Sequence, residues 1–407
     1  MQMLVPDANA RLLADERPVP TPNVPELLNN EPGSFAWGVL HDRTPKLINQ
    51  IRDAHPYEPH QRQALNDLLD EIANGTMQPL PQDSHDKAAW DSWGADYYGL
   101  PWADTPFLWS ESYFYRRLLH AVGFFTPGPW FWVDPFEHLK TAELRDPTLN
   151  TDLAALDHGA QLPIHEQAQT KLLAALWGNR ADLGFRVGMA PGSEHPEQEG
   201  LVADDSADLW TGLERSPSPR VCIVADNAGR ELLADLVLTD HLLNHDNAAQ
   251  VTLHVKPHPY YVSDAVTADV IACLRRLAAC PGEATKISQR LTEALADGRL
   301  SLYTHWFYNA PWSFHHMPAD LARAYEHATL TIMKGDLNYR RLVGDRHWPP
   351  TTPFNTTAAY FPSPVAVLRT LKSDIVTGVR PDDLNALDNT DPAWRTNGTH
   401  GLIQFRA

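Results

Sequence analysis

The side chains best suited to chemistry follow short apolar runs of the sequence. Asp226 and Asn227 stand side by side directly after the run RVCIVA, and Asp264 lies in the loop after the run VTLHVK. Carboxylate and amide oxygens are hard ligands that suit Mg²⁺, Mn²⁺ and similar divalent ions, and they leave positions for water and substrate. These loops lack cysteine and contain little histidine, which argues against zinc. Asp226, Asn227 and Asp264 therefore predict a site for a hard divalent cation.

Two lysines follow further apolar runs and could serve the same site. Lys334 comes directly after ATLTIM, and Lys372 lies shortly after VAVLR. An ammonium group is a point charge suited to a phosphate, and a helix starting after Asn227 would add free N–H groups. Glu231, one helical turn after Asn227, could support the site or simply favour the positive end of the helix dipole.

Each of these residues also has a purely structural explanation. Asp and Asn before a helix are common N-caps, which applies to Asp226, Asn227 and Asp264 taken singly. The coincidence of several polar loops after several strands favours a functional site.

The elements that would position these residues are visible in the second half of the chain. Short apolar runs alternate there with helical patterns, which is typical of a mostly parallel sheet covered by helices. The runs are RVCIVA, VTLHVK, SLYTHW, ATLTIM and VAVLR. Ligands of such sheets bind beyond the carboxyl ends of the strands, where the polar loops fall. The sequence predicts an α/β fold.

The first half of the chain has a different texture. Its patterns are helical and rich in aromatic residues, as in HQRQALNDLLDEIANG and SESYFYRRLLHAVGFF. We place the domain boundary within or just after the polar stretch APGSEHPEQEG. The expected domains are a helical N-terminal domain over 1–205 and an α/β domain over 206–407.

Composition limits the kinds of partner. The 407 residues include 33 Lys and Arg against 51 Asp and Glu, a formal net charge of −18, so a nucleic-acid partner is not expected. Three cysteines without a CxxC pair argue against a disulfide scaffold. We see no signal peptide and no apolar run near the roughly 20 residues that span a membrane, so we expect a cytoplasmic protein without a membrane partner. The oligomeric state stays open.

Several other chemistries lack their motifs. The turn ADNAG holds one glycine and a carboxylate where a dinucleotide or S-adenosylmethionine loop needs closely spaced glycines. Neither a GxxxxGK[ST] phosphate loop nor a GxSxG nucleophile elbow occurs. Ala228 occupies the position where an aspartyl-phosphate enzyme would carry its second acid.

The combined motifs resemble the metal-dependent damage-control phosphatases, also called domain of unknown function 89. The resemblance rests on DNAGRELLADLVLTDHLL, LHVKPHPYYVSDA, MKGDLNYRRL and VLRTLKSDIVTGV, and Arg-Thr-x-Lys marks the branch that includes the acidic-residue methyltransferase-like proteins. It extends into the helical half through DRTPKLINQI and PFLWSESYFYRRLL. The resemblance implies a three-layer α/β/α sandwich with a helical domain capping the strand ends.

The resemblance also implies roles for single residues. Asp226, Asn227 and Asp264 match the family's metal ligands, and Lys372 matches a lysine that holds the phosphorylated substrate. Glu111 and Glu231 match positions attributed to substrate or nucleotide contacts. The remaining matches to substrate-holding positions form one segment: Gly335, Asp336, Leu337, Asn338 and Tyr339.

We therefore expect hydrolysis of phosphate monoesters of small metabolites such as sugar phosphates. The expected ion is Mn²⁺, Co²⁺ or Ni²⁺, with Mg²⁺ as the alternative, and it would activate a water and neutralise phosphoryl charge. Asp264 or Asp336 would accept the proton of that water, and Lys334 and Lys372 would offset charge on the phosphoryl oxygens. Two alternatives stay open: an S-adenosylmethionine-dependent carboxyl methyltransferase, and a metal- or sugar-phosphate-binding protein without turnover.

Overall fold

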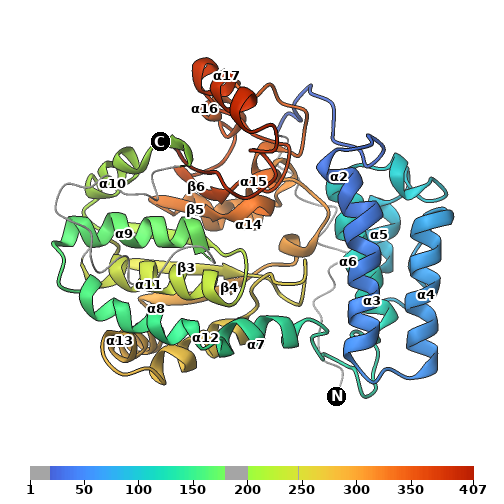
Figure 1. The fold of residues 1–407 in the computed structure, drawn as a ribbon, viewed down its shortest axis with the longest axis horizontal. Coiled ribbons are helices and arrows are strands. Elements are labelled where there is room, and N and C mark those ends of the chain that lie inside the picture. Colours follow the sequence, from blue (N-terminus) through green and yellow to red (C-terminus); the bar gives the residue numbers. More distant parts are fainter. Residues whose placement is uncertain (1–18, 179–199, 246) are drawn as a thin grey trace. The chain divides into compact units, whose positions relative to one another are not determined.

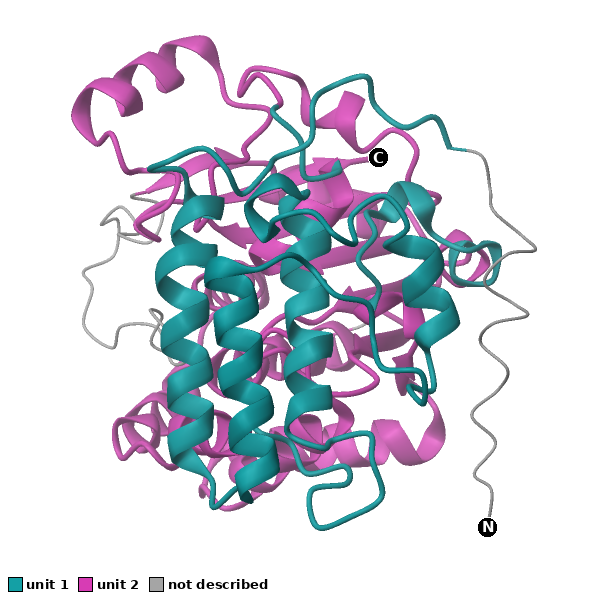
Figure 2. Cartoon of the chain, turned by 90° about the vertical axis from the view of Figure 1, so that its right-hand side faces the viewer, with its two compact units in different colours: residues 1–135, 310–322, 344–347 teal, residues 136–309, 323–343, 348–407 magenta. Residues whose placement is uncertain are grey.

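A computed structural model describes residues 19–178, 200–245 and 247–407. The chain divides into two compact units (Figure 2). Unit 1 comprises residues 1–135, 310–322 and 344–347, and unit 2 comprises residues 136–309, 323–343 and 348–407. Most of the polar stretch 190–200, within or just after which we expected the domain boundary, lies outside the described residues.

Unit 1 is helical, as the first half of the sequence predicts. Its longest helix, α4, begins at Pro59, where proline suits a first helical position because it lacks the N–H that a helix start leaves unpaired. Helix α6 is buried along most of its length and carries Glu111, of which 9% is exposed. The elements are α2 (Phe35–Gly38), η1 (Val39–Arg43), α3 (Thr44–Ala54), α4 (Pro59–Asn74), α5 (Lys87–Trp93), η2 (Trp102–Asp104), α6 (Phe107–Ala121) and η5 (Phe314–His316).

Unit 2 is built on a seven-stranded sheet with strand order β1-β7-β6-β5-β2-β3-β4. All neighbouring pairs are parallel except β6 and β7. All five apolar runs form strands, so the predicted α/β fold with a mostly parallel sheet is confirmed. The strands are β1 (Leu201–Asp204), β2 (Arg220–Val224), β3 (Gln250–Val255), β4 (Leu300–Thr304), β5 (Leu330–Lys334), β6 (Val365–Thr370) and β7 (Gly401–Arg406).

Helices cover the sheet (Figure 1). Those of unit 2 are α7 (Glu137–Arg145), α8 (Thr148–Gly159), α9 (Ile164–Trp177), α10 (Ser206–Glu214), α11 (Arg230–Asn244), α12 (Thr267–Ala278), α13 (Glu283–Asp297), η4 (Trp306–Asn309), α15 (Gly335–Val343), α16 (Phe354–Thr357) and α17 (Pro381–Thr390). Helix α14 (Ala319–Glu326) contains the change from unit 1 to unit 2. Among the described residues, no helix is long and apolar enough to cross a membrane.

The strands are buried on both faces. Ile223, Ile332 and Leu368 face a continuous apolar core that also contains residues of α8, α9, α11, α12 and α13. Their neighbours Val224 and Met333, which point the other way, are no more than 1% exposed. Burial on both faces explains why the sequence shows near-continuous apolar runs instead of strict alternation.

The unit boundary lies well before the predicted one at residue 205. Helices α7, α8 and α9 belong to unit 2, because α9 packs on α11 and against β6 and β7. The sequence of α9 has the same helical pattern as the helices of unit 1, and helical periodicity does not indicate which core a helix will cover.

The strand order of the sheet indicates where a ligand would bind. From β2 the chain adds β3 and β4 on one side, and it later adds β5 and β6 on the other. Ligands of open α/β sheets bind beyond the carboxyl ends of the strands at such a reversal. The residues that follow β2 and β5 therefore lie where a ligand is expected.

Two buried histidines of unit 2 make stability depend on pH. Burial lowers the pKa of His241 and of His254 to about 3 from the usual 6.5. A folded-state pKa below the unfolded value means that stability is fully present above pH 6.5 and is lost as the pH falls toward 3, by about 1.4 kcal/mol per pH unit for each group. Urea unfolding between pH 7.5 and 4.5 should therefore show a shallower acid loss for His254→Gln than for the native chain. His165→Gln, at an exposed position, is the control, and identical slopes for His254→Gln and the native chain would contradict the assignment.

Candidate active site

Backbone hydrogen bonds join the loops after β2 and β3. Asn227 and Asp264 form an isolated antiparallel bridge. The Ala265 amide donates to the Asp226 carbonyl at 2.8 Å, and the Ala228 amide donates to the Ser263 carbonyl at 2.6 Å. Asp226 and Asp264 therefore belong to one rigid backbone unit, although 38 positions separate them in the chain.

The loop before Asp264 has an unusual backbone. Tyr261 and Val262 have φ values of 48° and 66°. A β-branched residue rarely adopts this left-handed region, and such conformations persist where the surrounding structure imposes them, often at functional sites. The turn places the Ser263 hydroxyl so that it donates to Asn227 Oδ1 at 2.5 Å.

The Asn227 amide links the acidic groups of the site. Its Nδ2 donates to Asp226 Oδ2 at 3.1 Å and to Glu231 Oε2 at 2.9 Å. With the amide nitrogen facing the carboxylates, Oδ1 stays on the side of Ser263. The orientation of a carboxamide is set by its hydrogen-bond partners, and here three of them agree.

Gly335 allows the Asp226 carboxylate to lie against the end of β5. Its φ is +81°, and a Cβ at this position would lie 1.8 Å from Asp226 Oδ2 and 2.2 Å from Asp226 Cγ. No side chain fits in that space. Gly335, predicted as a substrate contact, thus sets where the Asp226 carboxylate can sit.

Lys334 is buried among carboxylates. Its Nζ lies 2.7 Å from Asp235 Oδ1 and 3.7 Å from Glu231 Oε1. Burial opposes the charged form, but the charges of Asp235 and Glu231 outweigh it and raise the pKa of Lys334. We predicted a lysine facing a phosphate, whereas the structure places its ammonium in an ion pair inside the protein.

Lys256 is a site residue that our sequence reasoning missed. It ends the run VTLHVK, and its Nζ lies 3.3 Å from Asp264 Oδ2 with both side chains 3% exposed. Burial raises the pKa of Asp264 to about 6, although Lys256 opposes the shift. A lysine closing an otherwise apolar strand was the available signal, because a charge is buried there only if it is paired.

The cluster carries an excess of negative charge. Four buried carboxylates, those of Asp226, Glu231, Asp235 and Asp264, face the two buried lysines Lys256 and Lys334. Burial raises the pKa of Asp226 well above its usual value, and the charges of Glu231 and Asp264 raise it further. Two uncompensated negative charges would be balanced by one divalent cation.

The donor set fits such a cation in its chemistry. Asp264 Oδ2 is a buried oxygen that is paired with the Lys256 ammonium at 3.3 Å, and it lies next to the backbone bridge with Asn227. Within the described ranges, no group of three or more His, Cys, Asp or Glu side chains is arranged to hold a metal ion. Two carboxylates and one amide form an oxygen-only set, which suits hard divalent ions.

Asp336 holds the loop after β6. Its Oδ1 accepts from Arg369 Nε at 2.8 Å and from Ser373 Oγ at 3.0 Å. Burial opposes ionisation, but the neighbouring Arg369 guanidinium holds the pKa of Asp336 below its usual range. A carboxylate with a lowered pKa is a weak base and is poorly suited to accept a proton.

The other residues of the Gly-Asp-Leu-Asn-Tyr segment face the protein interior. Asn338 Nδ2 donates to the carbonyls of Ala225 at 3.1 Å and Lys334 at 2.8 Å, which ties β2 to β5. The Tyr339 hydroxyl bonds to the Thr377 Oγ1 at 2.9 Å, and Leu337 is buried. These contacts position the segment.

Lys372 is exposed and lies near the carboxylates, since its charge acts on Asp226 and on Glu143. Glu143, from α7, is a second residue that our sequence reasoning missed. Its Oε2 accepts from the Arg230 amide at 3.3 Å and would lie 2.0 Å from a Cβ at Gly229, where φ is +72°. Burial raises the pKa of Glu143. No sequence pattern connects α7 with this turn.

Glu111 is the one predicted site residue that lies in unit 1, on α6. The other predicted site residues all lie in unit 2. The charged and amide-bearing ones among them belong to the acidic cluster or to the loops that support it.

Comparison with known proteins identifies the family. Residues 39–385 match the damage-control phosphatase ARMT1-like domain. The chain belongs to this family. It is 30% identical to the damage-control phosphatase ARMT1 of Mus musculus, with 92% of this chain and 96% of that protein covered. It is 28% identical to that of Danio rerio, with coverages of 92% and 95%.

Membership of the damage-control phosphatases confirms the resemblance seen in the motifs and supports a phosphatase role. Among solved structures, a DUF89 family protein from Pyrococcus horikoshii is similar, with a TM-score of 0.46, 15% identity and coverages of 84% of this chain and 95% of that one.

Proposed function

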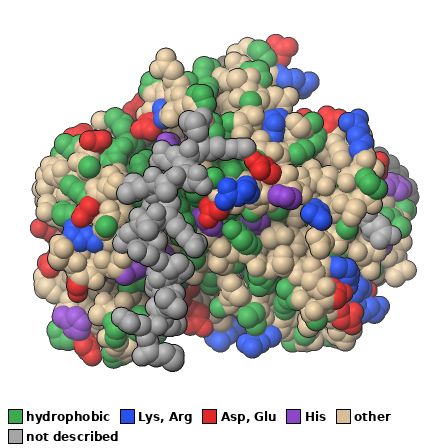
Figure 3. Space-filling model, turned by 180° about the vertical axis from the view of Figure 1, so that it is seen from behind, with side chains coloured by type: hydrophobic (Ala, Val, Ile, Leu, Met, Phe, Trp, Pro, Cys, Tyr) green, Lys and Arg blue, Asp and Glu red, His purple; other side chains and the backbone are tan. Residues whose placement is uncertain are grey.

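We propose that the chain is a metal-dependent phosphatase that hydrolyses phosphate monoesters of small metabolites such as sugar phosphates. The observation that carries the proposal is the backbone bridge between Asn227 and Asp264, which joins the loops that carry Asp226, Asn227 and Asp264 within an acidic cluster. Family membership supports the phosphatase part. We also propose a cytoplasmic location and no nucleic-acid partner. On the face in Figure 3, Lys and Arg of the described residues are interspersed with Asp and Glu instead of forming one basic patch.

Asp226, Asn227 and Asp264 would hold the cation, and Mn²⁺, Co²⁺, Ni²⁺ and Mg²⁺ all accept this oxygen set. A bound divalent ion would supply Lewis-acid chemistry, activating a water and neutralising charge on the phosphoryl group. Ser263 fixes the Asn227 amide, and Gly335 leaves room for the Asp226 carboxylate. Asp264, whose pKa burial raises to about 6, would accept the proton.

Lys372 would bind the phosphate. It is exposed, and its charge reaches the carboxylate cluster, so its ammonium can neutralise phosphoryl oxygens while its backbone is held by the loop. The Lys372 amide donates to Asp336 Oδ1 at 3.4 Å, and Arg369 and Ser373 bind the same oxygen. Asp336 and Arg369 are then positioning residues for Lys372.

Lys372→Ala should raise KM for phosphate esters and lower kcat. Loss of a charged hydrogen-bond donor to phosphate should reduce kcat/KM by about 10- to 100-fold. Steady-state kinetics on the best phosphate ester checks this, with Lys372→Arg expected to keep part of the activity. Lys286→Ala, at an exposed position on α13, is the control. Unchanged kinetics in Lys372→Ala would mean that the lysine is merely solvated.

A phosphate-release screen tests the function as a whole. The protein would be stripped with a chelator and assayed on a panel of sugar phosphates and other phosphometabolites, with each of the four ions added back. Release that requires an added ion is the expected result. Metal and ligand binding without release would instead favour a non-catalytic binding protein, and calorimetry with S-adenosylmethionine covers the methyltransferase alternative.

A further inference from the structure

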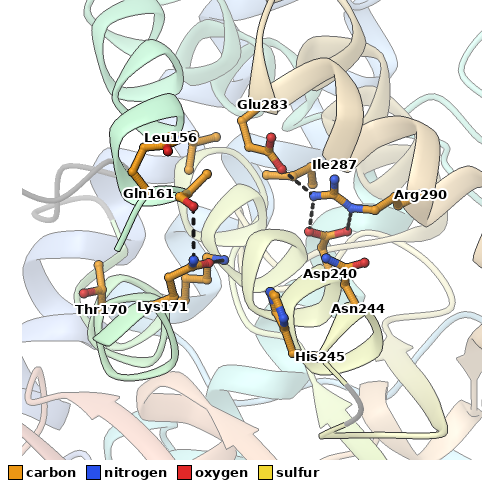
Figure 4. Close-up of a pocket in the computed structure, with 13 residues that line it drawn as sticks. Leu156, Gln161, Thr170, Lys171, Asp240, Asn244, His245, Glu283, Ile287 and Arg290 are labelled. Carbon is orange, nitrogen blue, oxygen red and sulfur yellow. Dashed lines mark hydrogen bonds and ion pairs between the residues drawn. The ribbon is translucent and has the colours of Figure 1, made fainter. Parts of the chain in front are cut away.

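A cavity in unit 2 lies between α8, α9, α11 and α13 (Figure 4). Its volume is about 260 Å³, and its lining is mostly polar or charged. This is slightly below the roughly 300 Å³ at which pockets for drug-sized ligands begin, so it suits a small metabolite. The acidic cluster described above involves the first half of α11, through Glu231 and Asp235, whereas this cavity lies at the end of the helix.

One wall carries two carboxylates and one guanidinium. Arg290 Nε and Nη2 donate to the two Asp240 carboxylate oxygens at 2.7 Å and 2.6 Å, and Nη2 also donates to Glu283 Oε1 at 2.7 Å. This leaves one negative charge in excess on the wall. Lys286 Nζ lies 3.3 Å from Glu283 Oε2, but its side chain is 64% exposed, so water screens its charge.

Lys171 lies across the cavity from this wall (Figure 4). Its Nζ forms hydrogen bonds with Gln167 Oε1 at 3.0 Å and with His241 Nδ1 at 3.3 Å, and both of these partner side chains are uncharged. Burial lowers the pKa of the Lys171 ammonium, although Asp240 opposes the shift. Among the described residues, no carboxylate lies within the 4.0 Å of an ion pair with Lys171. The second wall thus carries one positive charge in excess.

We propose that this cavity binds a small zwitterion of the amino-acid type. Its carboxylate would pair with Lys171, and its ammonium would lie at the Asp240 and Glu283 carboxylates. Each wall then gains the counter-charge that it lacks, and the apolar Leu156 and Ile287 in the lining accommodate a short aliphatic part. A simple anion or a simple amine would satisfy one wall only.

The proposal is independent of the phosphatase activity. Asp235, the cluster residue farthest along α11, precedes Asp240 by five residues, so the two lie roughly 7.5 Å apart along the helix axis and on different faces of the helix. Binding at the end of α11 can be measured directly, and it neither requires a divalent ion nor uses any residue of the acidic cluster.

Calorimetry and thermal shift on the full chain test the proposal. The probes are a panel of L-amino acids, the corresponding carboxylates without the amine (acetate, propionate and succinate), and the corresponding amines. We expect at least one amino acid to bind. Its affinity should fall by roughly 10- to 100-fold in Lys171→Met and in Glu283→Gln, the loss expected for one charged contact. Lys46→Met, the same change at an exposed position of α3, should bind as the native chain does.

Lys171→Gln separates loss of charge from misfolding, since glutamine can keep the hydrogen bond to His241 while it removes the charge. The circular dichroism of this variant should match that of the native chain. The proposal is overturned if no amino acid binds at 10 mM (about the weakest specific affinity of a small-molecule site). Equal affinity in the native chain and Lys171→Gln would also overturn it, as would acetate or an amine binding as tightly as the best amino acid.

Discussion

Gly335→Ala is expected to lose phosphatase activity by at least ~100-fold while the protein remains folded. A Cβ at this position would lie 1.8 Å from Asp226 Oδ2, whereas real Cβ contacts are essentially never below 3.0 Å. The carboxylate must therefore move by more than 1 Å, and a displacement of that size in an active site can cost ~100-fold in rate. Steady-state kinetics with saturating metal measures the effect.

Gly298→Ala is a matched control for this variant. Gly298 also has a positive φ, of +82°, but no atom lies within 4 Å of its added Cβ. Both substitutions bear the cost of about 1–2 kcal/mol of a left-handed non-glycine residue. Only Gly335→Ala adds the contact with Asp226. Comparable activity in the two variants would show that the position of the Asp226 carboxylate does not matter.

Asp226→Asn is expected to abolish activity and to raise the stability of the metal-free protein. Asparagine has nearly the same shape as aspartate but carries no charge. It therefore removes the repulsion between the Asp226 carboxylate and those of Glu231 and Asp264, and it removes the cost of burying a charge, both of which raise the pKa of Asp226. Loss of a charged oxygen that holds the cation should cost at least ~10³-fold in kcat/KM. Thermal unfolding in the presence of a chelator should show a higher Tm than for the native chain.

The opposite signs of the two effects make this variant informative. A residue with a purely structural role would lose stability on substitution, whereas a strained functional residue is retained at a cost in stability. Asp208→Asn, an exposed carboxylate on α10, should change neither property. Full turnover in Asp226→Asn would remove the proposed role, and a lower Tm in chelator would show that the carboxylate stabilises the fold.

The strands, and the edge of the sheet at which their carboxyl ends lie, could be predicted because burial on both faces leaves near-continuous apolar runs in the sequence. Apolar runs such as RVCIVA and VTLHVK form β2 and β3, and the polar residues that end them share one edge. The convergence of Asn227 with Asp264 follows from the parallel arrangement of those strands. Local pattern and topology agree here, so the position of this part of the site could be read from the sequence.

What the sequence did not reveal depends on tertiary contacts. Periodicity marks α9 as a helix but does not assign it to the core of unit 2. Lys334 is the last residue of β5, one position earlier than a residue that follows the strand. Its ammonium turns inward to Asp235, because packing decides whether a lysine faces solvent or a buried partner. Glu143 reaches the turn at Gly229 from a helix more than 80 positions earlier, and no spacing rule connects them.

If Asp226, Asn227 and Asp264 share one divalent cation, anomalous diffraction from crystals soaked in Mn²⁺ will locate it. We expect one strong peak about 2.0–2.3 Å from an oxygen of each of these three side chains. The same soak of Asp226→Asn crystals should show a weakened or absent peak. A peak at another position, or no peak in crystals of protein whose activity requires Mn²⁺, would show that these three side chains do not share a cation.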